Sequence, residues 1–293
     1  MISLIEIKNL TKYYGKHRGV ENIDLKVNKG ELFGFIGQNG AGKSTTIRLL
    51  LDFIRPTSGE CKIFGLSCIN NSKEIKKQVG YVPSEVNFYP HMKVSELLGY
   101  SQKLHKVKAS DEINRLCSLF EIDINVKIGE LSLGNKKKVA LVQAMFFKPQ
   151  ILIMDEPTNG LDPLMQIRLF EELKTLTDNG VTVFLSSHNL SEVQKYCTRV
   201  AIIREGKIVQ ISNVSEIINN NIKKVSMILN NMEDVQKLNK YSPIIKENLA
   251  EFLHEGNINE LIACLATIDI GGLEITEPSL EDSFMKYYGK EEK

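Results

Sequence analysis

The spacing of apolar residues changes several times along the chain, and each spacing indicates a different kind of element. Alternating or continuous apolar runs near the start read as strands at 2–8, 20–28, 31–36 and 60–64. A helix is expected from Lys43 to Phe53, because apolar residues recur there and Pro56 follows. The third strand leads directly into a glycine-rich loop, so this part of the chain predicts strand, loop and helix in succession.

The middle of the chain first becomes helical and then returns to strands. Apolar residues at three- and four-residue spacing predict helices at 94–105, 110–121, 134–147 and 163–179. Residues 151–154 and 181–185 are continuously apolar, which is typical of a parallel sheet buried on both faces. A hairpin around Glu205-Gly206 is expected over 199–211. Together these runs predict an α/β fold with a parallel-sheet core, an antiparallel β subdomain and a helical insertion.

The composition of the chain shifts after about residue 214. The polar stretch NNNIKK indicates a linker, and residues 225–288 alternate short strands with helices as a small α/β appendage. A chain of 293 residues suggests roughly two domains at about 150 residues each. We therefore expect a first domain at 1–213, with a helical subdomain at about 84–150, and an accessory α/β region at 214–293.

Composition excludes several classes of protein. Hydrophobic residues make up 42%, enough for a sizeable core, while 37 basic and 36 acidic residues argue against a dedicated nucleic-acid binder. The five cysteines show no zinc-ligand spacing and indicate reduced thiols. We expect no signal peptide, and no apolar run approaches the roughly 20 residues that cross a bilayer. Any membrane function would then need a partner.

The glycine-rich loop carries the most specific chemistry. Residues 37–45 read GQNGAGKST and comprise Gly37, Gln38, Asn39, Gly40, Ala41, Gly42, Lys43, Ser44 and Thr45. In this pattern backbone N–H groups cradle phosphates, Lys43 reaches the β- and γ-phosphates, and Ser44 ligates Mg²⁺. A phosphate loop alone leaves kinases, GTPases, helicases and transporters open.

Two acids and a histidine follow the later apolar strands. The run ILIMDE ends in Asp155 and Glu156, at the edge where ligands bind in parallel sheets. Because adjacent strand residues point opposite ways, we assign Asp155 to Mg²⁺ and Glu156 to the attacking water as general base. His188 follows the next strand and is placed to hydrogen-bond the γ-phosphate, although a lone histidine is more often structural.

The order of these motifs resembles the ATP-binding cassette (ABC) family. GQNGAGKST, LSLGN at 131–135, ILIMDEPTNGLDP at 151–163 and His188 resemble its phosphate loop, signature, second Walker motif with D-loop, and switch histidine. Tyr14 looks like the aromatic residue that stacks on adenine. The resemblance covers about 2–212. The ending ITEPSLEDSFMKYYG at 275–289 is similar to bacterial exporters of drug and antimicrobial-peptide resistance.

The resemblance implies a P-loop NTPase cassette and an ATP hydrolase that needs ATP and Mg²⁺. It also implies a head-to-tail homodimer, in which Ser132, Gly134 and Asn135 of one subunit contact the ATP of the other and Asp162 supports the interface. Hydrolysis would drive a separate integral membrane subunit, with export favoured. The chain would lie in the cytoplasm, peripheral to the inner face of the cell membrane, and no nucleic acid is expected.

Two departures from the family pattern and two rival functions stay open. Leu133 replaces a glycine of the usual LSGGQ signature, and Asn135 replaces its glutamine. Ser84 stands where a glutamine usually ligates Mg²⁺, with Glu85 beside it, and either residue could substitute. The rivals are a soluble cassette ATPase that acts on ribosomes or DNA, and a regulatory ATP-binding module with little turnover.

Overall fold

The computed structural model describes residues 2–218 and 222–276, which belong to two compact units. The first unit comprises residues 2–189 and 196–211, and the second comprises the remaining described residues. Within the described residues, no helix has the length and apolar character needed to cross a membrane. Residues 277–289 of the exporter-like ending lie outside the described residues, and the domain limits 1–213 and 214–293 stay predictions.

A six-stranded sheet forms the centre of the first unit. Its strands lie in the order β10 (Lys207–Asn213), β9 (Arg199–Arg204), β3 (Leu32–Ile36), β8 (Thr182–Ser187), β7 (Ile151–Asp155) and β6 (Val79–Val82). β3 runs parallel to β8 and β9, and β7 runs parallel to β8 and β6. Every residue of β3, β7 and β8 is buried, which confirms the predicted parallel core.

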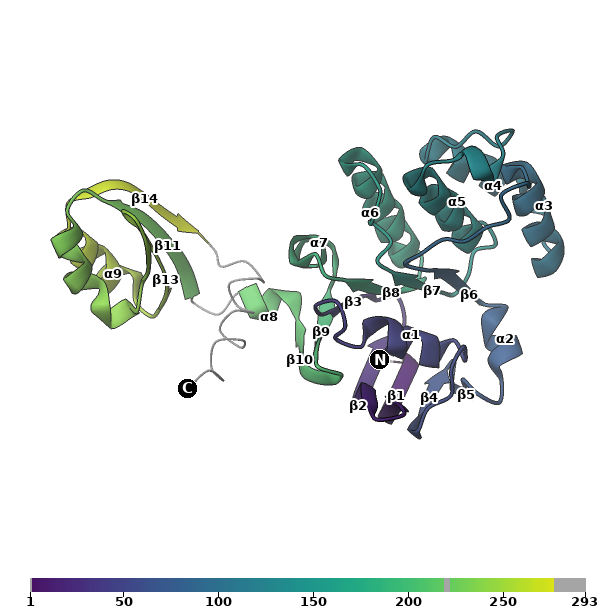
Figure 1. Ribbon diagram of the computed structural model, residues 1–293, viewed down its shortest axis with the longest axis horizontal. Helices are drawn as coiled ribbons and strands as arrows, with labels where there is room; N and C mark the ends of the chain where they lie inside the picture. Colours follow the sequence, from purple (N-terminus) through teal and green to yellow (C-terminus); the bar gives the residue numbers. More distant parts are fainter. Residues whose placement is uncertain (1, 219–221, 277–293) are drawn as a thin grey trace. The chain divides into compact units, whose positions relative to one another are not determined.

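Helices cover both faces of this sheet. Figure 1 shows α5 (Leu133–Met145) and α6 (Pro163–Asp178) on one side and α1 (Lys43–Leu50) on the other. α6 contacts β3 and β8, α5 contacts β6, and α1 contacts β7. The helical insertion adds α3 (Val94–His105) and α4 (Ser110–Leu119), which both pack on α5. The short helix α2 (Ser72–Lys76) precedes β6, and η1 (Ile128–Glu130) lies between α4 and α5 in the chain.

A four-stranded sheet at the start of the chain packs on α1 from the side opposite to β7. Its order is β2 (His17–Asn28), β1 (Ser3–Tyr14), β4 (Ser58–Ile63) and β5 (Leu66–Ser67), all antiparallel. α1 contacts β2 and β4 as well as β7, and Ile47 and Leu50 are buried in the core that both sheets share. The predicted antiparallel subdomain is therefore confirmed.

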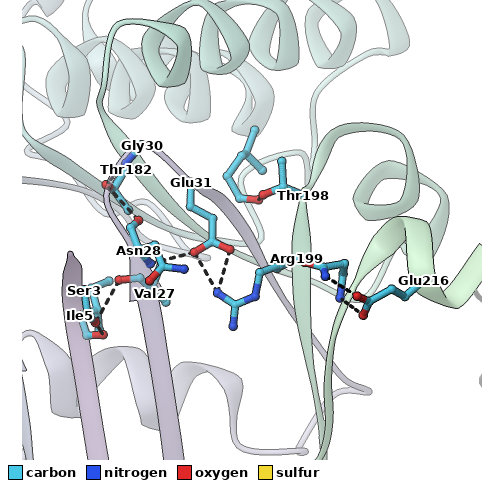
Figure 2. A network of polar contacts seen from close by, with 12 residues as sticks. Ser3, Ile5, Val27, Asn28, Gly30, Glu31, Thr182, Thr198, Arg199 and Glu216 are labelled. Carbon is cyan, nitrogen blue, oxygen red and sulfur yellow. Dashed lines mark hydrogen bonds and ion pairs between the residues drawn. The ribbon is translucent and has the colours of Figure 1, made fainter. Parts of the chain in front are cut away.

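Polar contacts anchor the chain where β3 begins (Figure 2). The buried carboxylate of Glu31 accepts a hydrogen bond from the backbone N–H of Asn28 at 2.8 Å and pairs with Arg199 at 3.0 Å. The backbone N–H of Gly30 donates to the hydroxyl of Thr182 at 2.9 Å. These bonds tie the turn before β3 to β9 and β8, so they fix the strand from which the phosphate loop emerges.

The second unit has an antiparallel sheet and a core of its own. The sheet order is β12 (Ile244–Lys246), β13 (Leu249–Glu255), β11 (Ile222–Leu229) and β14 (Ile270–Thr276). Val225, Phe252 and Leu261 belong to its apolar cluster, to which α9 (Ile258–Leu265) and η2 (Met232–Tyr241) contribute. α8 (Val214–Ile218) precedes the sheet. The alternation of strands and helices agrees with the predicted appendage.

Several elements differ from the sequence-based expectation. β6, β5, α2, α7 (Leu190–Tyr196) and α8 were not predicted, because each is too short to show a period. β1 continues from residue 8 to Tyr14 through register shifts that interrupt its alternation. The stretch read as a linker enters β11 at Ile222, where Lys223 and Lys224 lie half-buried between buried apolar residues.

Candidate functional site

The phosphate loop joins β3 to α1, and its conformation depends on glycine. Gly42 is the N-cap of α1 with φ 112°, and a Cβ there would approach the side chain of Val20 to 2.8 Å. A larger residue would therefore distort the loop. No side chain caps the first turn of α1, so its N–H groups and the helix dipole are available to an anion.

Lys43 is the first residue of α1, and its ammonium group is held inside the loop. The side chain is only 5% exposed, and Nζ donates to the carbonyl oxygens of Gly37 at 2.5 Å and Gln38 at 3.3 Å. A buried ammonium needs such acceptors, because burial without them is costly. The loop thus fixes a positive charge at its own centre.

The two acids at the end of β7 occupy different environments. Asp155 closes the strand, is 2% exposed and accepts a 2.5 Å hydrogen bond from Ser186 on β8. Glu156 lies one residue beyond the strand with φ 49°, a left-handed conformation that is uncommon for residues other than glycine. The alternation argument used to separate these two acids is therefore wrong, because Glu156 is directed by a left-handed turn and not by a strand.

The carboxylate of Glu156 joins Lys43 to His188. Its Oε1 lies 3.2 Å from Nζ of Lys43, and its Oε2 lies 2.8 Å from Nδ1 of His188. Oε1 is buried without a hydrogen-bond partner, so its interaction with Lys43 is an ion pair rather than a well-aligned hydrogen bond. The side chain of His188 is half exposed. Three of the predicted site residues therefore meet, although they lie on separate segments.

A cavity of about 480 Å³ opens beside these groups. Of the predicted residues, its wall contains Tyr14, Gln38, Asn39, Gly40, Gly42, Lys43, Ser44, Thr45, Ser84 and Glu156. Glu85, the alternative to Ser84, lines it too. Arg18, Gly19 and Asn159 also line it and were not predicted as site residues, although Asn159 lies within the second Walker motif and D-loop at 151–163. A cavity with a phosphate loop on one wall and Tyr14 on another suits a nucleotide.

Other predicted residues lie outside this wall. Gly37 and Ala41 form the loop behind it, and Asp155 is buried beside Ser186. Asp162 caps α6 by accepting a 3.0 Å hydrogen bond from the backbone N–H of Met165. Gly37, Ala41, Asp155 and Asp162 therefore belong to the loop, the strand end and the helix start around the cavity and do not line it.

The signature residues gather at the start of α5. Ser132 caps the helix by accepting a hydrogen bond from the N–H of Asn135 at 3.2 Å, and both residues are exposed. A Cβ at Gly134 would collide with the carbonyl oxygen of Gly160, so this position requires glycine. Leu133 is 66% exposed. The signature residues therefore form an exposed, capped helix start and do not line the cavity of their own chain.

Lys137 lies close to the site and was not predicted from the sequence. Its side chain is 2% exposed, and Nζ donates to the carbonyl oxygens of Pro83, Ser84 and Glu156. Burial lowers the pKa of Lys137, against the opposing effect of Asp155 and Glu156. Helical spacing offered little signal, because residues 137–142 are all buried and form no stripe with a separate exposed face.

The oxygen donors at the cavity fit Mg²⁺. The hydroxyl of Ser44 lines it, and the carboxylate of Asp155 is held by Ser186 at the adjoining strand end. Mg²⁺ prefers oxygen ligands and commonly takes only one or two carboxylates together with phosphate oxygens. Among the residues that the structure describes, no group of three His, Cys, Asp or Glu side chains could hold a metal ion alone.

A larger hollow of about 660 Å³ lies elsewhere in the first unit. It is lined by residues such as Met145, Leu176 and the ion-paired Arg115 and Glu172, and by none of the predicted site residues. The hydrogen bonds that Arg115 donates to Glu172 and Glu112 raise the pKa of Arg115, so its charge is already neutralised by carboxylates. The smaller cavity is therefore the candidate site, because it holds the phosphate loop.

Comparisons with known proteins agree with this geometry. A family model described as ABC transporter matches residues 20–159. The chain is 33% identical to the bacitracin transport ATP-binding protein BcrA of Bacillus licheniformis, over 99% of this chain and 98% of that protein. It is 31% identical to Nod factor export ATP-binding protein I of Cupriavidus metallidurans, over 76% and 75% of the two chains. A solved ATP-binding subunit of an ABC transporter matches with a TM-score of 0.69 and 28% identity, over 73% of this chain and 92% of that one.

Proposed function

The chain belongs to the ATP-binding proteins of ABC transporters, and on this premise we propose that the cavity beside Lys43 is its hydrolytic site. The chain is an ATP hydrolase that works with a membrane component, and the rival role on ribosomes or DNA is not favoured by its relatives. The observation that carries the site is the contact series from Lys43 through Glu156 to His188.

ATP would lie with its phosphates in the loop 37–45 and its adenine on Tyr14. Lys43 supplies the buried positive charge, and the start of α1 supplies N–H groups for the phosphate oxygens. Tyr14 is 43% exposed at the cavity wall, so its ring is accessible for stacking. Arg18 lines the same cavity and adds a second positive charge.

Mg²⁺ would be held by Ser44 and Asp155, together with Ser84, which lines the same cavity as Ser44. Ser186 orients the carboxylate of Asp155 through their 2.5 Å hydrogen bond. When bound, the metal would neutralise negative charge on the phosphate oxygens. Ser44, at the second position of α1, and Ser84, after β6, would bring their oxygens from separate segments.

Glu156 is proposed as the general base. His188, for which a hydrogen bond to the γ-phosphate stays a prediction, lies against Glu156 and would also orient it. Oε2 of Glu156 lies 2.8 Å from Nδ1 of His188, which restrains one carboxylate oxygen. Nζ of Lys43 lies 3.2 Å from the Glu156 carboxylate and balances its charge. When ATP binds, Lys43 would pair with a phosphate in place of Glu156. A carboxylate in this position can accept a proton from an attacking water.

Two copies of the chain would complete each other's sites in a homodimer. Ser132 and Asn135 are exposed at the start of α5 and do not line their own cavity, which suits a role in the site of a second copy. Gly134 keeps this helix start free of a side chain, and Asp162 shapes the adjoining turn before α6. A helix N-terminus capped by Ser132 can receive an anion.

Transport is proposed to run outward, by a complex in which this chain lies at the inner face of the cell membrane. The name of one full-length relative describes bacitracin transport, and the name of another relative describes Nod factor export. The membrane subunit is proposed to contact the residues between β6 and α3, where the helical insertion begins and where Tyr89 is 73% exposed.

ATP turnover by the purified chain tests this assignment. Glu156→Gln keeps the size of the side chain but cannot accept the proton, so turnover should fall by about 10²–10⁴. Glu171→Gln, at an exposed acid of α6, is the matched control and should keep turnover. Near wild-type turnover by the Glu156→Gln variant would remove Glu156 as the base.

A further inference from the structure

A single buried ammonium group connects three segments around the cavity. Nζ of Lys137 donates to the carbonyl oxygens of Pro83 and Ser84 at 2.8 Å each, and to that of Glu156 at 3.3 Å. Lys137 lies in the second turn of α5, the helix that Ser132 caps. The segment after β6, the residue after β7 and the signature helix are therefore held at one point.

All three donors of this ammonium group are used, and all three acceptors are backbone carbonyls. A lysine with 2% exposure is costly unless its charge is well solvated by the protein. Apolar replacements of buried charges are often as stable, so stability alone is a weak reason for a lysine here. The carbonyls belong to segments next to the cavity, which indicates a role in the geometry of the site.

The backbone of Glu156, to whose carbonyl Lys137 donates, has an unusual conformation. Its left-handed φ of 49° is unfavourable for a residue with a side chain, so surrounding bonds must hold it. Its N–H donates to the carbonyl of Ser186 at 3.1 Å, and its own carbonyl accepts from Asn159 at 3.3 Å as well as from Lys137. The direction of the Glu156 carboxylate depends on this backbone conformation.

We propose that Lys137 is a positioning residue for ATP hydrolysis, which holds the backbone of Glu156 and of residues 83–84 in the geometry that turnover requires. The proposal rests on the proposed role of Glu156 as the base. Lys137 does not itself line the cavity, but it donates to the backbone carbonyls of Ser84 and Glu156, which do, so it acts through these backbones. Through α5 it also links them to Ser132, the N-cap residue of the same helix, five residues before Lys137.

The test separates turnover from binding. Lys137→Met keeps the length of the side chain and removes the three donors, so kcat should fall by about 10²-fold, as expected for a misplaced catalytic group. The Kd of MgATP should change by less than about threefold, because Lys43 and the loop are untouched. Lys103→Met, at an exposed lysine of α3, controls for loss of one positive charge.

A double-mutant cycle shows whether Lys137 acts through Glu156. In the Glu156→Gln background, Lys137→Met should lower the residual turnover by less than about threefold, because the base is already lost. A further loss equal to that in the wild-type background would overturn the proposal. If Lys137→Met lowers the melting temperature too far for measurement, Lys137→Leu, which also removes all three donors, is judged by the same criteria.

The two proposals fail in different ways. Wild-type turnover by Glu156→Gln would contradict the proposed function itself. The role of Lys137 alone would be overturned if Glu156→Gln loses turnover while a folded Lys137→Met keeps a kcat within about twofold of wild type. A rise in the Kd of MgATP that matches the fall in turnover would also overturn it, because Lys137 would then support binding.

Discussion

The ammonium nitrogen of Lys43 lies 3.2 Å from Oε1 of Glu156, and both side chains are less than one-tenth exposed. Lys43 begins α1 after β3, and Glu156 follows β7, with β8 between these two strands in the sheet. Such a pair is held by mutual attraction that offsets the cost of burial, and removal of one partner leaves an unpaired buried charge. The phosphate-binding charge and the proposed base are therefore electrostatically linked.

Replacement of Lys43 tests the phosphate loop. Lys43→Ala removes the buried counter-charge for the phosphates, so MgATP affinity should weaken by at least about tenfold. Lys103→Ala, at an exposed position on α3, should leave the affinity unchanged. The measurement is a nucleotide titration, with a thermal melt to show that both variants fold. An unchanged affinity in the Lys43→Ala variant would contradict the phosphate-loop assignment.

Photo-crosslinking tests the docking of a membrane subunit. The segment from Ser84 to Glu96 leads into α3, and within it Tyr89 is 73% exposed whereas Val86 is buried. A photoreactive phenylalanine analogue at Tyr89 should therefore capture an integral membrane protein in membranes of the native cell. The same analogue at Val209, exposed on β10, is the control and should capture none. Capture of ribosomal proteins alone from Tyr89 would favour the rival function.

Alkaline pH tests the environment of Tyr81 on β6. Burial, and less strongly the charge of Asp155, raise the pKa of Tyr81 from 10.0 to about 12. Below pH 10.0 the folded and unfolded chains both hold this proton, whereas between pH 10.0 and about 12 the unfolded chain loses it first. The contribution of Tyr81 to stability is therefore complete below this window and is lost as the pH rises through it.

Chemical denaturation at about pH 9 and about pH 11 measures this effect. Tyr81→Phe should lose less of its free energy of unfolding between the two pH values than the wild type does. Tyr89→Phe, at an exposed tyrosine, controls for loss of a phenol. An equal loss in Tyr81→Phe and wild type would show that Tyr81 ionises alike in the folded and unfolded chains.

The elements that sequence predicted well have strong local signals. α3 has the predicted bounds, because Glu96 accepts a hydrogen bond from the N–H of Lys93 and the helix buries Val94, Leu97 and Leu98 at helical spacing. The phosphate loop is equally local, since strand, glycines and helix follow one another. Such features depend on neighbouring residues and can be read without the fold.

The features that sequence did not predict depend on contacts between distant segments. The left-handed backbone of Glu156 is fixed by bonds to Ser186 and Lys137, which no local pattern shows. Lys137 stands in a run of three lysines, a composition that usually indicates a solvated face. Most residues that line the cavity were therefore predicted from the sequence, whereas Arg18, Gly19, Lys137 and the bonds that orient Glu156 required the fold.

The shared ATP site of the proposed homodimer is tested by light scattering and turnover on one preparation of Glu156→Gln. This variant should bind ATP and Mg²⁺, lose turnover by about 10²–10⁴ and have the mass of a dimer only when both are present, because unhydrolysed ATP stays between the copies. Ser132→Ala in the same background should weaken that dimer, because it removes the cap of α5. A Glu156→Gln variant that loses turnover but stays a monomer with saturating ATP and Mg²⁺ would contradict the shared site.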